Sequence, residues 1–166
     1  MVTRDDQGFW NVVFSLLFIA LVVLSMRLLL LENGSLPREI PPYDLVLIML
    51  ATFRLTRLFV YDKITQFFRD WFLVKTVFLG ENDELVIIRQ NPVSGPRRTI
   101  SELLSCPWCI GMWVAPFVTF FYFYTTFAWF IILFLAIAGV ATFLQLLSNM
   151  IGWKAEQLKQ KVKSRD

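Results

Sequence analysis

No charged side chain occurs between Leu103 and Trp153. One membrane-crossing helix needs about 20 apolar residues, and this uncharged run holds roughly fifty. A single straight helix over the run would exceed about 70 Å in length, against a hydrocarbon core of about 30 Å. The run must therefore fold back on itself within lipid. We predict two spans here, over about 110–124 and 128–150, joined by an aromatic-rich turn at the membrane surface.

Two further apolar segments precede this run. Residues 9–31 are too long for the apolar part of a signal peptide, and no small-residue cleavage pattern follows them, so a retained first span is expected. Residues 43–60 follow a turn-rich connection that ends in Pro41 and Pro42, and they are expected to form a second span. The sequence thus predicts an all-α integral membrane protein with four transmembrane helices arranged as two hairpins.

The segments outside the spans are amphipathic or polar. Over 62–78, apolar residues recur at spacings of three and four between charged ones, which predicts an amphipathic helix in the membrane interface. Residues 80–105 are predicted to form a short polar loop region, and residues 153–166 a basic tail. Because 57% of the chain is hydrophobic and no polar stretch is long enough for a separate core, residues 1–166 are expected to be one membrane domain.

The distribution of positive charge predicts the orientation of the chain. Lys and Arg gather between the second and third spans and in the tail, whereas the two hairpin tips share one basic residue, Arg38. Because basic residues favour short cytoplasmic loops, both termini are expected on the cytoplasmic side of a bacterial inner membrane. The net charge of +3 fits anionic lipid headgroups, and no nucleic-acid partner is predicted.

The chain contains no histidine. Histidine is the commonest metal ligand and the commonest general base, so many enzyme classes become improbable. Carboxylates for a catalytic metal would need to be clustered, and Asp62, Asp70 and Glu102 are scattered along the sequence. We therefore expect a protein without catalytic activity and predict no cofactor.

Cys106 and Cys109 form a Cys-Pro-Trp-Cys motif, the spacing of dithiol oxidoreductases. Proline is well tolerated at the first position of a helix, so Cys106 is expected to cap the third span. The βαβ context of such enzymes is missing, and two thiols supply half of a structural zinc site, so zinc would need ligands from another chain. The competing interpretation is that the small cysteines allow Trp108 and Trp113 to pack where the helix enters the membrane.

Charged and aromatic residues also gather at the end of the second span. Spacings of three and four put Arg54, Arg57 and Tyr61 along one helical face, directly before Asp62. Two guanidinium groups on this face would bind a lipid phosphate or a carboxylate of a partner. The alternative is unspecific contact with headgroups or pairing within the chain, in which Asp62 pairs with Arg57 or with an arginine of the central loop.

The fourth span carries a patch of small residues that includes Ala136 and Gly139, followed by the uncharged polar residues Gln145 and Asn149. Small residues allow close helix contact, and amide side chains form hydrogen bonds between helices. Packing within this chain and docking to another membrane protein both agree with the pattern.

Two motifs of this chain resemble those of a known family. They are Ala51-Thr52-Phe53-Arg54-Leu55-Thr56-Arg57-Leu58 with Val60-Tyr61-Asp62-Lys63-Ile64, and Ser105-Cys106-Pro107-Trp108-Cys109 with Gly111 and Trp113. From Tyr43 to Asn149 the chain is similar to a family of small uncharacterised membrane proteins of bacteria, notably spore-formers, and their phages. That family carries a domain-of-unknown-function label, and some members are named as sporulation proteins. The resemblance implies one cytoplasm-facing cluster of both motifs where the second and third spans meet, and it implies no reaction.

The interpretation that these patterns favour is an accessory or scaffold subunit of a membrane protein assembly. Its partners would be membrane lipids and other membrane protein subunits or further copies of itself. An alternative is an anionic lipid- or anion-binding membrane protein that uses Arg54 and Arg57. A second alternative is a membrane dithiol oxidoreductase that uses Cys106 and Cys109.

Overall fold

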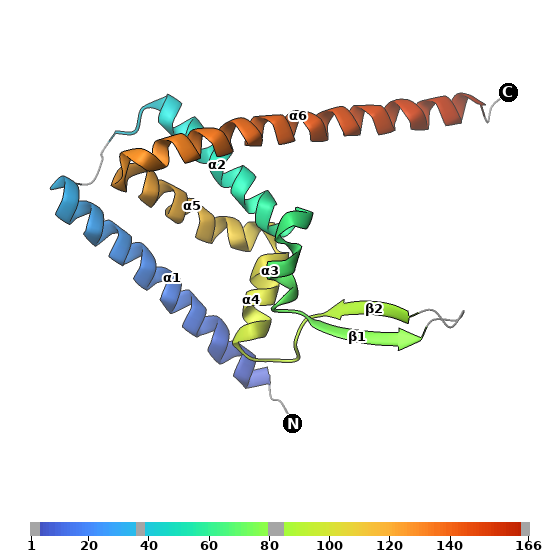
Figure 1. Cartoon of the computed structure of the whole chain (residues 1–166), viewed down its shortest axis with the longest axis horizontal. Helices are drawn as coiled ribbons and strands as arrows, with labels where there is room; N and C mark the ends of the chain where they lie inside the picture. The colour runs from blue at the N-terminus through green and yellow to red at the C-terminus, as the bar shows by residue number, and fades with distance from the viewer. Residues whose placement is uncertain (1–3, 36–38, 80–84, 164–166) are drawn as a thin grey trace.

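Four long helices form most of the computed structural model, which describes residues 4–35, 39–79 and 85–163. They are α1 (Arg4–Asn33), α2 (Pro42–Val60), α5 (Pro107–Tyr124) and α6 (Thr126–Lys163). The end of α1, the start of α2, the end of α5 and the start of α6 lie at one end of the molecule (Figure 1). The short elements between α2 and α5 lie at the opposite end. The connection from α1 to α2 and the connection from α5 to α6 are therefore at the same end of the molecule.

Three helices in the described part of the chain are long and apolar enough to cross a membrane. They cover Gln7–Asn33, Pro107–Tyr124 and Thr126–Val162. Helix α2 is not among them, because Asp44, Arg54 and Arg57 interrupt its apolar sequence. The prediction of a mainly helical, membrane-compatible chain is therefore confirmed, whereas the count of four spans stays a prediction.

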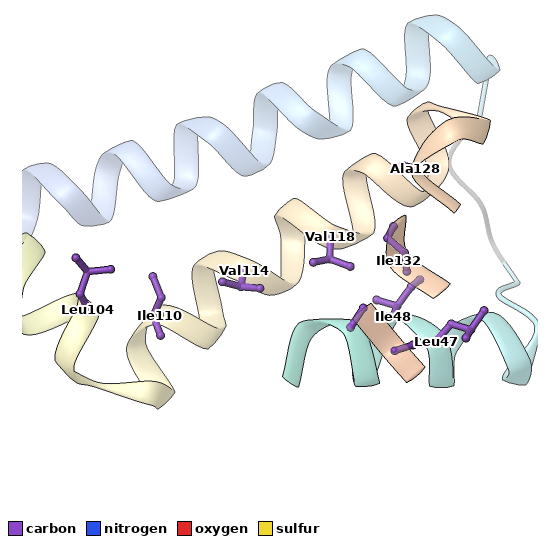
Figure 2. Packing of buried hydrophobic residues seen from close by; sticks show 10 residues of the cluster. Leu47, Ile48, Leu104, Ile110, Val114, Val118, Ala128 and Ile132 are labelled. Carbon is purple, nitrogen blue, oxygen red and sulfur yellow. The ribbon is translucent and has the colours of Figure 1, made fainter. Parts of the chain in front are cut away.

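The core lies where α2, α5 and α6 meet. On α5 and α6 the buried side chains recur every four residues, which places them on one face of each helix. Figure 2 shows Val118 and Ile132 next to Ile48, while Val114, Ile110 and Leu104 follow one another along α5 toward α4. The cluster consists of Leu47, Ile48, Ala51, Leu104, Ile110, Val114, Val118, Ala128, Ile132 and Ala136.

The outward faces of the helices are apolar as well. Phe134 and Ile137 on α6 are 65% and 61% exposed, and Leu16 on α1 is 61% exposed. Water-soluble monomers rarely expose contiguous apolar surface of this extent. Acyl chains of a bilayer cover such faces without cost, so the packing supports a membrane location.

Helix α1 lies beside α5 and contributes no residue to the core cluster. The ring of Phe18 contacts that of Trp113, with 5.2 Å between centroids. Near the start of α1, Gln7 Nε2 donates a hydrogen bond to Thr99 Oγ1 at 2.8 Å, and Thr99 Oγ1 donates to Asn11 Oδ1 at 3.2 Å. These polar contacts attach α1 to α4 (Pro96–Ser105), the short helix that precedes α5.

The amphipathic helix predicted over 62–78 was wrong beyond Asp70. A 3-10 turn, η1 (Lys63–Thr65), and a short helix, α3 (Gln66–Asp70), replace its first half. The second half is strand β1 (Val74–Leu79), which pairs antiparallel with β2 (Leu85–Gln90). The β-branched residues of both segments favour strands, and each supplies the other with a pairing partner.

This two-stranded hairpin projects from the helices (Figure 1). Asp70 attaches it to α3, because its carboxylate forms ion pairs with Lys75 at 2.9 Å and with Arg89 at 3.1 Å. The hydrogen bond from Lys75 and the charges of Arg89 and Lys75 hold the pKa of Asp70 below its ordinary value of 3.8. The region predicted as a polar loop over 80–105 thus contains β2 and α4 in its described part.

Candidate functional site

Arg54 and Asp62 form an ion pair at the end of α2. Arg54 Nη2 lies 2.8 Å from Asp62 Oδ2, with the two side chains 22% and 27% exposed. The partner of Asp62 is therefore Arg54, eight residues earlier, rather than Arg57 or an arginine of the central loop. Because Asp62 already neutralises the Arg54 guanidinium, Arg54 is less available for an external anion.

Arg57 lies against aromatic rings on the same helix. Its guanidinium carbon is 4.7 Å from the ring centroid of Tyr61 and 6.0 Å from that of Phe53. The Nε atom of Arg57 is buried and has no hydrogen-bond partner within the described residues. A buried donor without an acceptor costs about 1–3 kcal/mol, so this position suits an acceptor oxygen from outside the chain.

Two side chains that follow α2 donate hydrogen bonds to carbonyl groups in its last turn and just beyond its end. Thr65 Oγ1 donates hydrogen bonds to the carbonyl oxygens of Leu58 and Asp62. Arg69 donates from Nη1 to the carbonyl oxygen of Phe59 at 2.7 Å and from Nη2 to that of Asp62 at 3.0 Å. The amphipathic pattern over 62–78 predicted Arg69 on the polar face of a helix and did not indicate these hydrogen bonds. This role could have been expected, because a helix leaves its last four carbonyl groups unpaired and unpaired carbonyl groups are costly near lipid.

Cys106 lies between α4 and α5 and caps α5, as predicted. Its Sγ accepts a hydrogen bond from the backbone N–H of Cys109 at 3.3 Å, and Cys109 Sγ donates to it at 2.6 Å. The Cys109 thiol and the backbone N–H groups of Cys109 and Trp108 lower the pKa of the Cys106 thiol below its ordinary value of 9.0. Both cysteines are free.

A cavity of about 570 Å³ opens beside the two cysteines, between α1, α4 and α5. Its walls are mainly apolar, with a polar edge on the side of α4. Besides the cysteines, its lining includes Asn11, Phe14, Phe18, Glu102, Met112 and Trp113. Within the described residues, no group of three or more cysteine or acidic side chains is arranged to hold a metal ion.

The arginine and cysteine motifs lie at the same end of the helices, at the end of α2 and the start of α5. The cysteines face the cavity beside α1 and α4, whereas the arginines pair with Asp62 and Tyr61 at the end of α2. The motifs meet at Gly111, where an added Cβ would lie 3.7 Å from Thr56 Oγ1, and Tyr61 and Ser105 line one small pocket. The single cluster implied by the family resemblance stays a prediction.

The small residues of α6 pack inside this chain. Ala136 is 2% exposed, and a Cβ added at Gly139 would lie 2.6 Å from the carbonyl oxygen of Leu50 on α2. Gln145 and Asn149 lie farther along α6, where Gln145 Nε2 donates to Asn149 Oδ1 at 3.1 Å. Both amides are exposed. Packing within the chain therefore accounts for Ala136 and Gly139 but not for Gln145 and Asn149.

The described part of the chain is mainly helical, and its helices expose apolar faces, which defines a membrane-compatible helical fold. Residues 47–148 match a family model described as "Protein of unknown function (DUF1360)", and the chain belongs to this family. The matched residues contain both motifs and run from α2 to α6, whereas α1 lies outside them.

Two relatives from Bacillus subtilis (strain 168) resemble this chain over part of its length. UPF0713 protein YngL is 35% identical over 101 residues, which cover 60% of this chain and 74% of the relative. Sporulation protein YjcA is 37% identical over 107 residues, which cover 62% of this chain and 88% of the relative. No solved structure matches the chain.

Proposed function

We propose that the protein is a non-catalytic accessory or scaffold subunit of a membrane protein assembly, and that α6 binds a helix of another membrane protein. In this proposal α1, α2, α5 and the uncharged part of α6 form four spans. Both termini face the cytoplasm of a bacterial cell, because the basic residues gather at that end.

The observation that carries the proposal is the exposed second half of α6. From residue 143 to residue 162 every side chain is exposed, although residues up to Gly152 are uncharged. Figure 1 shows this half extending past α2 and away from the other helices. At about 1.5 Å per residue, α6 is about 57 Å long and exceeds the hydrocarbon thickness of about 30 Å.

Acyl chains cannot satisfy the amide side chains of Gln145 and Asn149 on this half of α6. Their mutual hydrogen bond uses one amide proton of Gln145 and the oxygen of Asn149. The oxygen of Gln145 and the amide nitrogen of Asn149 retain hydrogen-bonding capacity that acyl chains cannot satisfy. A polar side chain on a neighbouring membrane helix would complete these bonds.

The test is the double substitution Gln145→Leu with Asn149→Leu in the full-length protein. We expect about a tenfold loss of cross-linking to co-purifying membrane proteins in mild detergent, because each interhelical hydrogen bond is worth about 1–2 kcal/mol. The matched control replaces Gln157 and Gln160, exposed amides of the same helix beyond its uncharged part, by leucine. A wild-type protein that is isolated alone as a monomer would contradict the proposal, as would equal cross-linking of both double variants.

The unbonded Nε of Arg57 favours a second candidate function, the binding of an anionic lipid headgroup. A phosphate oxygen would supply the missing acceptor, while the rings of Phe53 and Tyr61 hold the guanidinium in place. A headgroup phosphate suits this position because guanidinium groups form charge-assisted hydrogen bonds with phosphate oxygens.

For this candidate, we expect Arg57→Gln to reduce retention of phosphatidylglycerol by about tenfold, the effect of losing one charge-assisted hydrogen bond. Native mass spectrometry of the protein extracted from vesicles that contain phosphatidylglycerol and phosphatidylethanolamine measures the bound lipid. Arg97→Gln is the control, because Arg97 is exposed and donates one hydrogen bond to the carbonyl oxygen of Leu73. Equal lipid content in both variants would exclude the headgroup site.

A further inference from the structure

The Cys106–Cys109 pair has a geometry suited to reversible oxidation. Both residues precede or begin the first turn of α5, and their sulfur atoms are 2.6 Å apart. Because both thiols are free and already in contact, a disulfide can form here with little movement of the backbone. This arrangement is independent of α6 and of the proposed docking function.

The cavity next to the pair provides room for a second molecule. Phe14 and Phe18 of α1 pack against Trp113 of α5 and form part of its wall with it, and about 570 Å³ is enough for a small aromatic group. Asn11 and Glu102 add polar groups on one side. A dithiol in the wall of a mainly apolar cavity selects reaction partners that are apolar themselves.

We propose that Cys106 and Cys109 form a thiol–disulfide exchange site whose substrate is a disulfide with apolar or aromatic substituents, seated in the cavity between α1, α4 and α5. Helix α1 lies outside the residues that match the family model, and it supplies one wall of this cavity. Helix α1 therefore determines which disulfides reach the Cys106–Cys109 pair.

The exchange proceeds in two displacements at sulfur. The Cys106 thiolate attacks one sulfur of the substrate R–S–S–R, so that a Cys106–S–R bond forms and the first R–S⁻ leaves with the electron pair of the broken bond. The released R–S⁻ takes up the proton that the Cys106 thiol lost when it ionised. Cys109 then loses its proton and attacks Cys106 Sγ, and the second R–S⁻ leaves and takes up that proton. Two protein thiols are oxidised to one disulfide, and one substrate disulfide is reduced to two thiols.

Cys106 is the attacking residue because the local hydrogen bonds stabilise its thiolate. Its sulfur accepts from the backbone N–H and the thiol of Cys109 at the start of α5, where the helix dipole also favours negative charge. Cys109 donates its proton toward Cys106 and is therefore the resolving residue. The lowered pKa of Cys106 agrees with this assignment.

The roles of the two cysteines are tested with 4,4′-dithiodipyridine, a neutral aromatic disulfide, on the reduced full-length protein in lipid nanodiscs. The wild type should release two thiopyridone molecules per chain and end with an internal disulfide and no bound pyridyl group. Cys109→Ser should release one and keep a pyridyl adduct, and Cys106→Ser should react about tenfold more slowly than Cys109→Ser. Stable adducts on both wild-type cysteines, or equal rates of the two variants, would overturn the proposal.

The role of the cavity is tested by filling it. Ser15→Phe places a ring in the cavity, whereas Ser25→Phe places one on the same helix beside a different, smaller cavity. The two serines are matched, because each donates a hydrogen bond to the carbonyl oxygen four residues earlier on α1. We expect Ser15→Phe alone to slow the reaction with the aromatic disulfide by about tenfold, while bis(2-hydroxyethyl) disulfide reacts unchanged. Equal rates for the two serine variants would overturn the assignment of the cavity.

Discussion

Replacing Gly139 by alanine is expected to lower the free energy of unfolding by about 3 kcal/mol, near the upper end for overpacking a core. The added Cβ would lie 2.6 Å from the carbonyl oxygen of Leu50 and 3.4 Å from Arg54 Cβ. The first of these atoms belongs to the backbone of α2 and cannot rotate away. Helix α6 must therefore move off α2, which separates the helices that build most of the core.

Two other glycines provide matched controls for Gly139→Ala. A Cβ at Gly152, also on α6, meets nothing within 4 Å, and a Cβ at Gly111 meets only an ordinary contact with Thr56 at 3.7 Å. Both alanine variants should therefore be neutral or slightly stabilising, because alanine favours helix over glycine by about 1 kcal/mol. Unfolding in mixed micelles of increasing denaturing detergent, followed by circular dichroism, compares the three. Equal midpoints for Gly139→Ala and Gly152→Ala would show that α6 does not cross α2 at Gly139.

At Gly139 the sequence predicts a close helix contact but not the helix that makes it. The cluster of small residues around Ala136 and Gly139 predicts that a second helix approaches closely, since small side chains have few other uses in a span. The identity of that helix depends on the crossing of α6 over α2, which brings residues 50 and 139 together. No local pattern encodes a contact between positions so far apart in sequence.

The segment after α2 shows where a pattern supports two structures. Apolar residues at spacings of three and four predicted one helix over 62–78, and this spacing is satisfied only as far as Asp70. Beyond it, Val74, Thr76 and Val77 are β-branched and find a partner in β2. Pairing with a distant strand decides between helix and strand here, and the periodicity of a single segment does not contain that information.

For the residues of the candidate site as well, local features were predictable from the sequence and contacts between distant segments were not. The cap that Cys106 forms on α5 is local, so the Cys-Pro sequence was enough to predict it. The ion pair of Arg54 with Asp62 requires the chain to turn after Val60, and the cavity beside the cysteines requires α1 to pack on α5. The chemistry of each side chain was readable in advance, whereas its partner depended on how the helices assemble.

Replacing Arg69 by leucine is expected to lower the free energy of unfolding by about 2–4 kcal/mol, because two charge-assisted hydrogen bonds are lost. Without Arg69, the carbonyl oxygen of Phe59 loses its side-chain donor, and that of Asp62 keeps only the hydrogen bond from Thr65. Lysine keeps the positive charge near the carbonyl end of the helix but cannot donate with two nitrogens in a fixed fork, so Arg69→Lys should recover less than half of the loss.

The control for Arg69 is Arg97→Leu, which removes an exposed arginine with one hydrogen bond to a backbone carbonyl and should cost about 0.5–1 kcal/mol. Detergent unfolding gives the stabilities, and hydrogen exchange at the last turn of α2 shows where stability is lost. In Arg69→Leu the amides of Tyr61 and Asp62, which donate to the carbonyl oxygen of Arg57, should exchange faster, while those in the middle of α2 keep their protection. If Arg69→Leu costs no more than Arg97→Leu, water or lipid headgroups satisfy these carbonyls, and the end of α2 lies outside the apolar part of the membrane.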